Sequence, residues 1–199
     1  MAENLNLNLT GSKCRKLNPD NASDRMPKDE CDRYPYGRVY SWDLMMNSEK
    51  SSNTDPSGVQ GICPEGWHIP SKAEAEVLFA FAEGTRTPLK SKKEYKAYDV
   101  NDETSGYGWD ENIANKGTDV FGFAALPGGT AGTGTTSASR FAEKHDSGGF
   151  WFATENPDNV SQAFQWTVGT NYSTTNFMTK NSSTAGGTLR SVRCVKDPD

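Results

Sequence analysis

The chain has 199 residues, of which 34% are apolar, and a formal charge of −5. This length suits a single domain over residues 1–199, which can bury about two-thirds of the surface of its unfolded chain. The negative charge argues against nucleic acid or an anionic membrane as a partner, and no stretch approaches the roughly 20 apolar residues of a membrane-spanning helix.

Two helices are predicted in the first half of the chain. Ser41 is a suitable N-cap for a short helix that presents Trp42, Met45 and Met46. Ser71 and Glu74 have the S-x-x-E spacing of a capping box, and Gly84 is a natural stop signal. The residues between them follow the apolar spacing of a helix: Ala75, Leu78, Phe79 and Ala82. We therefore expect a helix from about 72 to 83.

The second half reads as strands joined by long loops. Residues 90–119 show no convincing period, which is typical of a packed functional loop or of an element that the pattern does not reveal. Four aromatic and β-branched segments follow, separated by Gly-rich turns; these predicted strands are 120–127, 148–155, 162–168 and 189–195. Because helices and strands do not alternate, the fold class is predicted to be α+β, with one or two helices and short antiparallel strands.

Four cysteines bear on the compartment in which the protein functions. They show no C-x-x-C pair, so a zinc site is not indicated. We favour the pairs Cys14–Cys31 and Cys63–Cys194 among the three pairings that four cysteines allow, and disulfides imply an exported protein. The alternative is four reduced, buried thiols. Residues 1–6 lack the features of a signal peptide, so the sequence is read as cytosolic or as a mature or excised form.

Six sequence blocks occur in order across nearly the whole chain: MAENLN, YGRVYSW, CPEGWHIPS, GTDVFGFAALPGG, GGFWFATEN and SVRCVKD. Together they resemble the Fibrobacter succinogenes major paralogous domain, a bacterial family usually found on exported, surface-associated proteins. That family is similar to the C-type lectin-like superfamily. The superfamily also holds the formylglycine-generating enzyme fold and the variable proteins of diversity-generating retroelements.

The resemblance carries expectations about fold and location. It implies a C-type lectin-like fold with paired termini, long loops, and a final strand whose Cys194 is disulfide-linked to Cys63 in the body. It also implies an extracellular or cell-surface location, as a secreted protein or lipoprotein. The segment between Cys14 and Cys31 is longer than the family pattern, and the expected signal or anchor is not part of this sequence.

Catalysis and metal binding are weakly indicated. No Ser or Cys nucleophile is accompanied by an evident base and orienting group, and we expect the protein not to be an enzyme and to need no cofactor. Calcium is the alternative, because it prefers several oxygen ligands. Its candidate ligands are Glu155, Asn156 and Asp158, or Asp99, Asn101, Asp102 and Glu103. The competing interpretation is an Asn-Pro turn and an acidic loop.

A polar and aromatic segment over about 156–188 is the predicted binding surface. Half of the residues between Asn159 and Thr188 are Asn, Ser or Thr, with aromatic residues among them. Such a mixture combines rigid contact area with adaptable hydrogen bonds, and it suits protein or carbohydrate ligands. The predicted ligand-binding residues are Trp166, Asn171, Tyr172, Thr174, Asn176, Phe177 and Asn181. Packing in the core is the alternative for Trp166.

Three functional hypotheses follow. The leading one is a non-catalytic, surface-exposed adhesion domain that binds carbohydrate or protein. The second is a hypervariable receptor diversified by a retroelement, because Asn, Ser, Thr and Tyr are the residues that adenine-targeted diversification would leave. The third is a purely structural module of a larger surface protein.

Overall fold

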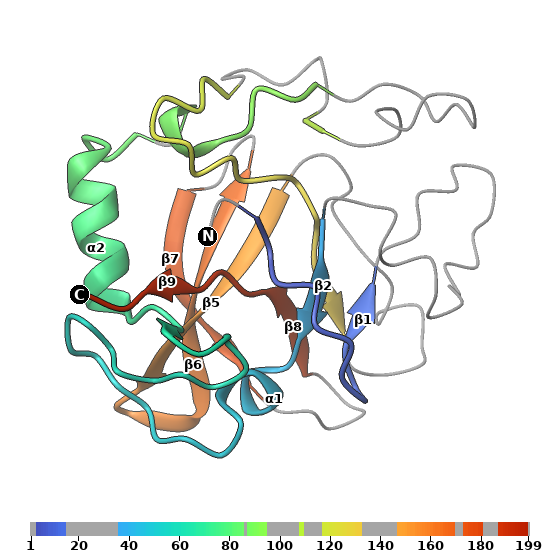
Figure 1. Cartoon of the computed structure of the whole chain (residues 1–199), viewed down its shortest axis with the longest axis vertical. Coiled ribbons are helices and arrows are strands. Elements are labelled where there is room, and N and C mark those ends of the chain that lie inside the picture. Colours follow the sequence, from blue (N-terminus) through green and yellow to red (C-terminus); the bar gives the residue numbers. More distant parts are fainter. Residues whose placement is uncertain are drawn as a thin grey trace.

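Long strands from the C-terminal half form the centre of the molecule (Figure 1). A computed structural model describes residues 3–14, 36–85, 87–94, 108–109, 117–132, 147–169, 173–180 and 187–198. In these residues, seven strands form one sheet in the order β1-β2-β8-β5-β6-β7, with β4 paired to β8, while β3 pairs with β9. The strands are β1 Lys13–Cys14, β2 Arg38–Tyr40, β3 Trp67–His68, β4 Ala131–Gly132, β5 Ser147–Asn156, β6 Asn159–Gly169, β7 Ser173–Thr179, β8 Thr188–Ser191 and β9 Val195–Lys196.

The sheet confirms an α+β architecture but differs in detail from the expected one. β5 and β6 have 10 and 11 residues and pair in antiparallel register, with Phe150 opposite Trp166. β8 instead pairs with β5 in parallel, so the sheet is mixed and not purely antiparallel. The predicted strand over 189–195 is divided, because β8 ends at Ser191 and β9 begins at Val195 in the two-stranded sheet.

Both predicted helices are present. Helix α1 spans Trp42–Met46, and the Ser41 hydroxyl accepts a hydrogen bond from its first turn. Helix α2 spans Lys72–Phe81 and begins with the predicted capping box, in which Ser71 and Glu74 satisfy each other's backbone N–H groups. The helix ends at Phe81, earlier than the predicted residue 83, and Gly84 then takes a left-handed conformation with φ +66°.

Two segments differ from their predictions. Residues 120–127 contain only an isolated bridge from Ala125 to Lys90. The backbone is not extended here because Asp119 and Ala124 adopt positive φ. The Asp119 carboxylate also accepts a hydrogen bond from Ala124 N. Residues 173–179 lie in the predicted binding surface and were not predicted to be a strand, but they form strand β7. The hydrogen bonds of β6 order this polar segment, although few of its residues are apolar.

The central strands are buried on both faces. Within β5, Phe150 and Phe152 belong to one apolar cluster, with α2, whereas Trp151 and Ala153 belong to another, with α1. This division follows from the alternation of side chains along a strand. It explains why the sequence FWFA is continuously apolar, since each face of β5 contacts its own layer of the core.

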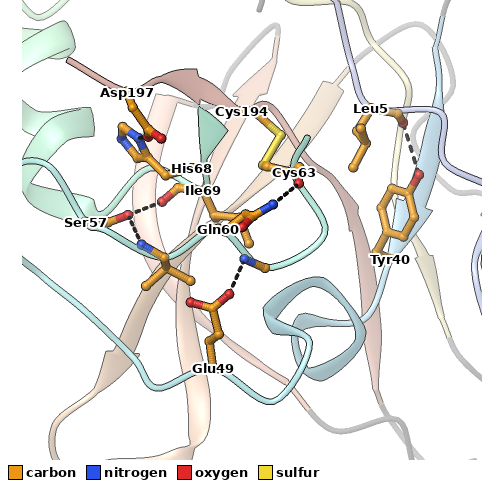
Figure 2. Close-up of a disulfide and its surroundings, with 12 residues drawn as sticks. Leu5, Tyr40, Glu49, Ser57, Gln60, Cys63, His68, Ile69, Cys194 and Asp197 are labelled. Atoms are coloured by element: carbon orange, nitrogen blue, oxygen red, sulfur yellow. Dashed lines mark hydrogen bonds and ion pairs between the residues drawn. A yellow bond between two sulfur atoms is a disulfide. The ribbon is translucent and has the colours of Figure 1, made fainter. Parts of the chain in front are cut away.

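The two ends of the described chain meet beside the sheet. Leu5 N donates to Val192 O at 2.9 Å, and the Tyr40 hydroxyl donates to Leu7 O at 2.9 Å. The predicted disulfide between Cys63 and Cys194 is present, with the two Cα atoms 5.9 Å apart (Figure 2). Cys14 is also disulfide-bonded, but its predicted partner Cys31 lies outside the described residues. In the part of the chain that the structure describes, no helix is long and apolar enough to span a bilayer.

Candidate functional site

The structure describes the predicted binding residues unevenly. Thr174, Asn176 and Phe177 lie in β7, where their backbones pair with Thr167, Gln165 and Phe164 of β6. Asn171, Tyr172 and Asn181 lie outside the described residues. Over residues 156–169, the exposed residues lie in the β5–β6 turn and the start of β6, at 157–161. Strand β7 therefore brings three of the predicted residues onto one edge strand of the sheet.

Trp166 occupies a different environment from that turn. Its side chain is 1% exposed and belongs to the apolar cluster beneath α2. Aromatic rings surround it: the ring centroids of Phe79, Phe150 and Phe123 lie 5.0, 5.5 and 5.6 Å from its own. Trp166 thus takes part in core packing, which was the alternative considered for it, and a ligand could contact it only through an opening in that packing.

Such an opening lies between α2, the central strands and the C-terminal segment. It is a cavity of about 670 Å³ whose walls are mostly aromatic and apolar. Its aromatic residues are Trp67, Phe79, Phe81, Phe123, Phe150, Trp151, Phe152 and Trp166. Val77 and Phe81 on α2 line it while remaining 60% and 68% exposed. The volume is in the range of pockets that enclose small molecules.

Arg193 supplies a buried positive charge to the cavity wall. Its side chain donates to Asn4 Oδ1 at 2.7 Å, to Ala124 O at 3.0 Å and to Phe123 O. The guanidinium carbon lies 4.3 Å from the centroid of the Phe123 ring. Burial lowers the pKa of Arg193 to about 10, against the opposing effect of nearby carboxylates, so the side chain remains charged at neutral pH. It joins the N-terminal segment and residues 123–124 to the C-terminal segment.

His68 connects α2 to the end of the chain, as Figure 2 shows for its contact with Asp197. Its Nδ1 lies 2.6 Å from Asp197 Oδ1, and its Nε2 lies 2.7 Å from Glu74 Oε1. Burial alone would lower the pKa of His68, but hydrogen bonds and charges from the two carboxylates outweigh burial, and the net pKa is raised. Both ring nitrogens face carboxylates, so neither is directed at a Ser or Cys side chain.

We expect this histidine to make stability depend on pH. Its folded-state pKa lies above the ordinary value of 6.5, so its stabilising contribution is fully present below about pH 6.5 and is lost as pH rises through the folded-state pKa. Urea unfolding of the wild type between pH 6 and pH 9 measures this loss. The His68→Gln variant should show a smaller fall over that interval, and an equally steep fall in the variant would assign the effect to other groups.

Two of the three calcium candidates in the described part of the chain, Glu155 and Asn156, have side chains with structural partners. Glu155 forms an ion pair with Lys180, whose ammonium lies 4.1 Å from the centroid of the Trp42 ring. The Asn156 side chain donates to Gln162 Oε1 and accepts from Asp158 N, which forms the β5–β6 turn. No cluster of three or more His, Cys, Asp or Glu suited to a metal occurs among the described residues. The second candidate set, Asp99, Asn101, Asp102 and Glu103, lies outside them.

Sequence reasoning missed most of the cavity. Phe79 and Phe150 were identified only as apolar positions of a helix and a strand, and Phe123 as part of a strand that does not form. Arg193 carried a usable signal, because a charged residue inside the apolar run SVRCV requires buried partners. Nothing local indicated that these four residues would line one space.

Comparison with known proteins identifies one family. A family model described as the Fibrobacter succinogenes major domain matches residues 1–196. No curated protein and no solved structure matches the chain.

Proposed function

The chain belongs to the Fibrobacter succinogenes major domain family, and from this membership and its geometry we propose that it is a non-catalytic, surface-exposed domain that binds carbohydrate or protein ligands. The proposed binding surface is the polar and aromatic segment over about 156–188. The residues proposed to contact the ligand are Thr174, Asn176 and Phe177 on β7, and Asn171, Tyr172 and Asn181 in the flanking sequence, whereas Trp166 is buried in the core and is not part of this surface.

The position of β7 carries this proposal. The strand is the last one in the order of the sheet and pairs only with β6 in the described part of the chain. Its sequence, STTNFMT, places hydroxyl and amide side chains beside an aromatic and an apolar residue. An edge strand has backbone N–H and C=O groups on one side that another strand can pair with, and its side chains add specificity to that pairing.

The C-terminal end of this segment is firmly attached to the body. Lys180, which follows β7, is buried and paired with Glu155 of β5, and its backbone N–H donates to Ser161 O at 3.0 Å. β8 then leads into Cys194 and its disulfide with Cys63. An attached segment loses less conformational entropy when a ligand binds, which favours recognition by an ordered surface.

The proposal also includes a C-type lectin-like fold and an extracellular or cell-surface location. Contact between the two chain ends and a disulfide to the C-terminal segment are compatible with a C-type lectin-like fold. Disulfides form and persist in oxidising environments, which supports an extracellular or bacterial cell-surface location, as a secreted protein or lipoprotein.

Binding arrays test the proposed surface. Plant and host glycans and bacterial surface proteins are immobilised and probed with the wild type and with Tyr172→Ala and Phe177→Ala. We expect at least one class of ligand to be retained, and the alanine variants to bind it about thirtyfold or more weakly if these aromatics anchor the contact.

A matched control separates binding from folding. Val120 is 65% exposed and lies outside the segment, so Val120→Thr should bind like the wild type. If both aromatic variants fold and bind with wild-type affinity, the proposed surface is wrong. If the wild type retains no ligand from either class, the chain is better described as a structural module.

A further inference from the structure

In the described residues, every buried tryptophan except Trp166 donates its indole N–H to a backbone carbonyl. The indole N–H of Trp42 donates to Phe152 O at 2.8 Å, that of Trp109 to Ala125 O at 3.0 Å, and that of Trp151 to Tyr40 O at 3.0 Å. Trp166 is as deeply buried as these three, but its Nε1 has no hydrogen-bond partner among the residues that the structure describes. Leaving such a donor unsatisfied costs about 1–3 kcal/mol, so it requires an explanation.

The unpartnered indole lies on the wall of the 670 Å³ cavity. Rings of Phe79, Phe123 and Phe150 pack against Trp166 and offer no oxygen or nitrogen acceptor. The cavity is the adjoining space that protein atoms do not fill. Among the described residues no acceptor reaches this N–H, and Nε1 itself is closed to solvent, so a molecule in the cavity can pair with it only where the packing around the indole opens.

Charges at the cavity limit what that molecule can be. Arg193 is 5% exposed and lines the cavity, and its hydrogen bonds go to neutral oxygens. No carboxylate of the described residues lies within ion-pair distance of it. The Glu74 carboxylate is engaged on both oxygens, by His68 and by the backbone N–H groups of Ser57 and Ser71. Asp55 and Lys196, both exposed, contribute opposite charges. Asp119 and Glu3 act on Arg193 only from beyond ion-pair distance, so the buried charge that lacks an ion-pair partner in the described part of the chain is positive.

We propose that this cavity binds a small planar aromatic anion. The ring of the ligand packs among the aromatic walls, and its oxygen accepts the N–H of Trp166 in the field of Arg193. Aromatic walls favour an aromatic ring through offset-stacked and edge-to-face contacts, and the volume suits a molecule of one or two fused rings. This site is distinct from the edge surface of β7 and does not depend on the function proposed for it.

Nuclear magnetic resonance of the indole N–H groups tests the proposal directly. The probe is 2-naphthoate, titrated into ¹⁵N-labelled protein whose tryptophan signals are assigned by substitution. We expect a saturable downfield shift of the Trp166 indole proton, as it gains an acceptor, and little change at Trp42 and Trp109, whose N–H groups already donate to backbone carbonyls. 2-Methylnaphthalene, which has the ring but no acceptor, should bind about tenfold or more weakly.

Variants separate the site from general apolar binding. Trp166→Phe keeps an aromatic ring without the donor, and Ala75→Met extends a side chain of α2 into the space; each should weaken naphthoate binding about tenfold or more. Val160→Thr, at an exposed position away from the cavity, should bind like the wild type. Unchanged Trp42 and Trp151 indole signals show that a variant retains its fold.

Three results would overturn the inference. One is the absence of a saturable Trp166 shift at millimolar naphthoate. Another is equal affinity for naphthoate and 2-methylnaphthalene, which would make the site merely apolar; this comparison uses the wild type and holds even if a variant fails to fold. The third is wild-type affinity in a folded Trp166→Phe or Ala75→Met protein.

Discussion

Replacing both Cys63 and Cys194 by alanine is expected to destabilise the protein by about 5 kcal/mol. The two residues are 131 positions apart in the sequence, and in the chain-entropy model a cross-link that closes so long a loop removes much of the freedom of the unfolded chain. For a chain of this length, that loss corresponds to a fall in melting temperature of roughly 10–20 °C. Calorimetry and urea unfolding measure it.

The second cysteine pair provides the comparison. If Cys14 pairs with Cys31, as predicted, that bond closes a much shorter loop, and the double alanine variant should lose about 3 kcal/mol. Reduction of the wild type under denaturing conditions, followed by refolding with the thiols blocked, should lower the stability by the sum of the losses in the two double variants. A smaller loss for the Cys63 and Cys194 variant than for the Cys14 and Cys31 variant would contradict this account.

We expect Gly61→Ala to lower the free energy of unfolding more than any other turn-glycine substitution that we consider. Gly61 has φ +52°, and an added Cβ would lie 2.4 Å from Met45 O and 2.3 Å from Ile69 Cδ1. Met45 O is a backbone atom that accepts from Ile62 N, and Ile69 is fully buried. The left-handed conformation costs an alanine about 1–2 kcal/mol, and overpacking adds about 1–3 kcal/mol.

Gly66 offers a matched control for this substitution. It also has a positive φ, +77°, but an added Cβ would meet nothing within 4 Å. Gly66→Ala should therefore cost only the conformational part, roughly 1–2 kcal/mol. Equal urea midpoints for the two variants would show that the turn at Gly61 relaxes away from Met45 and Ile69, against our expectation.

Prediction from sequence succeeded where the signal is local. The capping box of Ser71 and Glu74 and the N-cap at Ser41 depend on residues three positions apart, and both helices begin where predicted. The aromatic strands over 148–155 and 162–168 also formed, within the longer β5 and β6. In each case the residues that make the decisive contacts are close in the sequence or share one short period.

Prediction was wrong where apolar content and strand formation diverge. Residues 120–127 are rich in apolar residues, yet Val120 and Phe121 are exposed, and positive φ at Asp119 and Ala124 prevents an extended strand. Strand β7 has the opposite composition and forms because β6 supplies a partner in continuous register. Strand formation in these two segments depends on whether a neighbouring strand is available, and composition does not encode that.

The sequence by itself determined the α+β class, the start of each helix, the central strands and the residues from which the Cys63–Cys194 disulfide forms. Only the tertiary structure decided that, among the described residues, the Trp166 indole N–H has no acceptor and Arg193 has no ion-pair partner, and that His68 lies between Glu74 and Asp197. The physical reason is that the partner of a buried polar group can belong to a segment that is distant in the sequence and is brought near only by folding. His68 and Asp197 are 129 residues apart, and no local pattern constrains such a meeting.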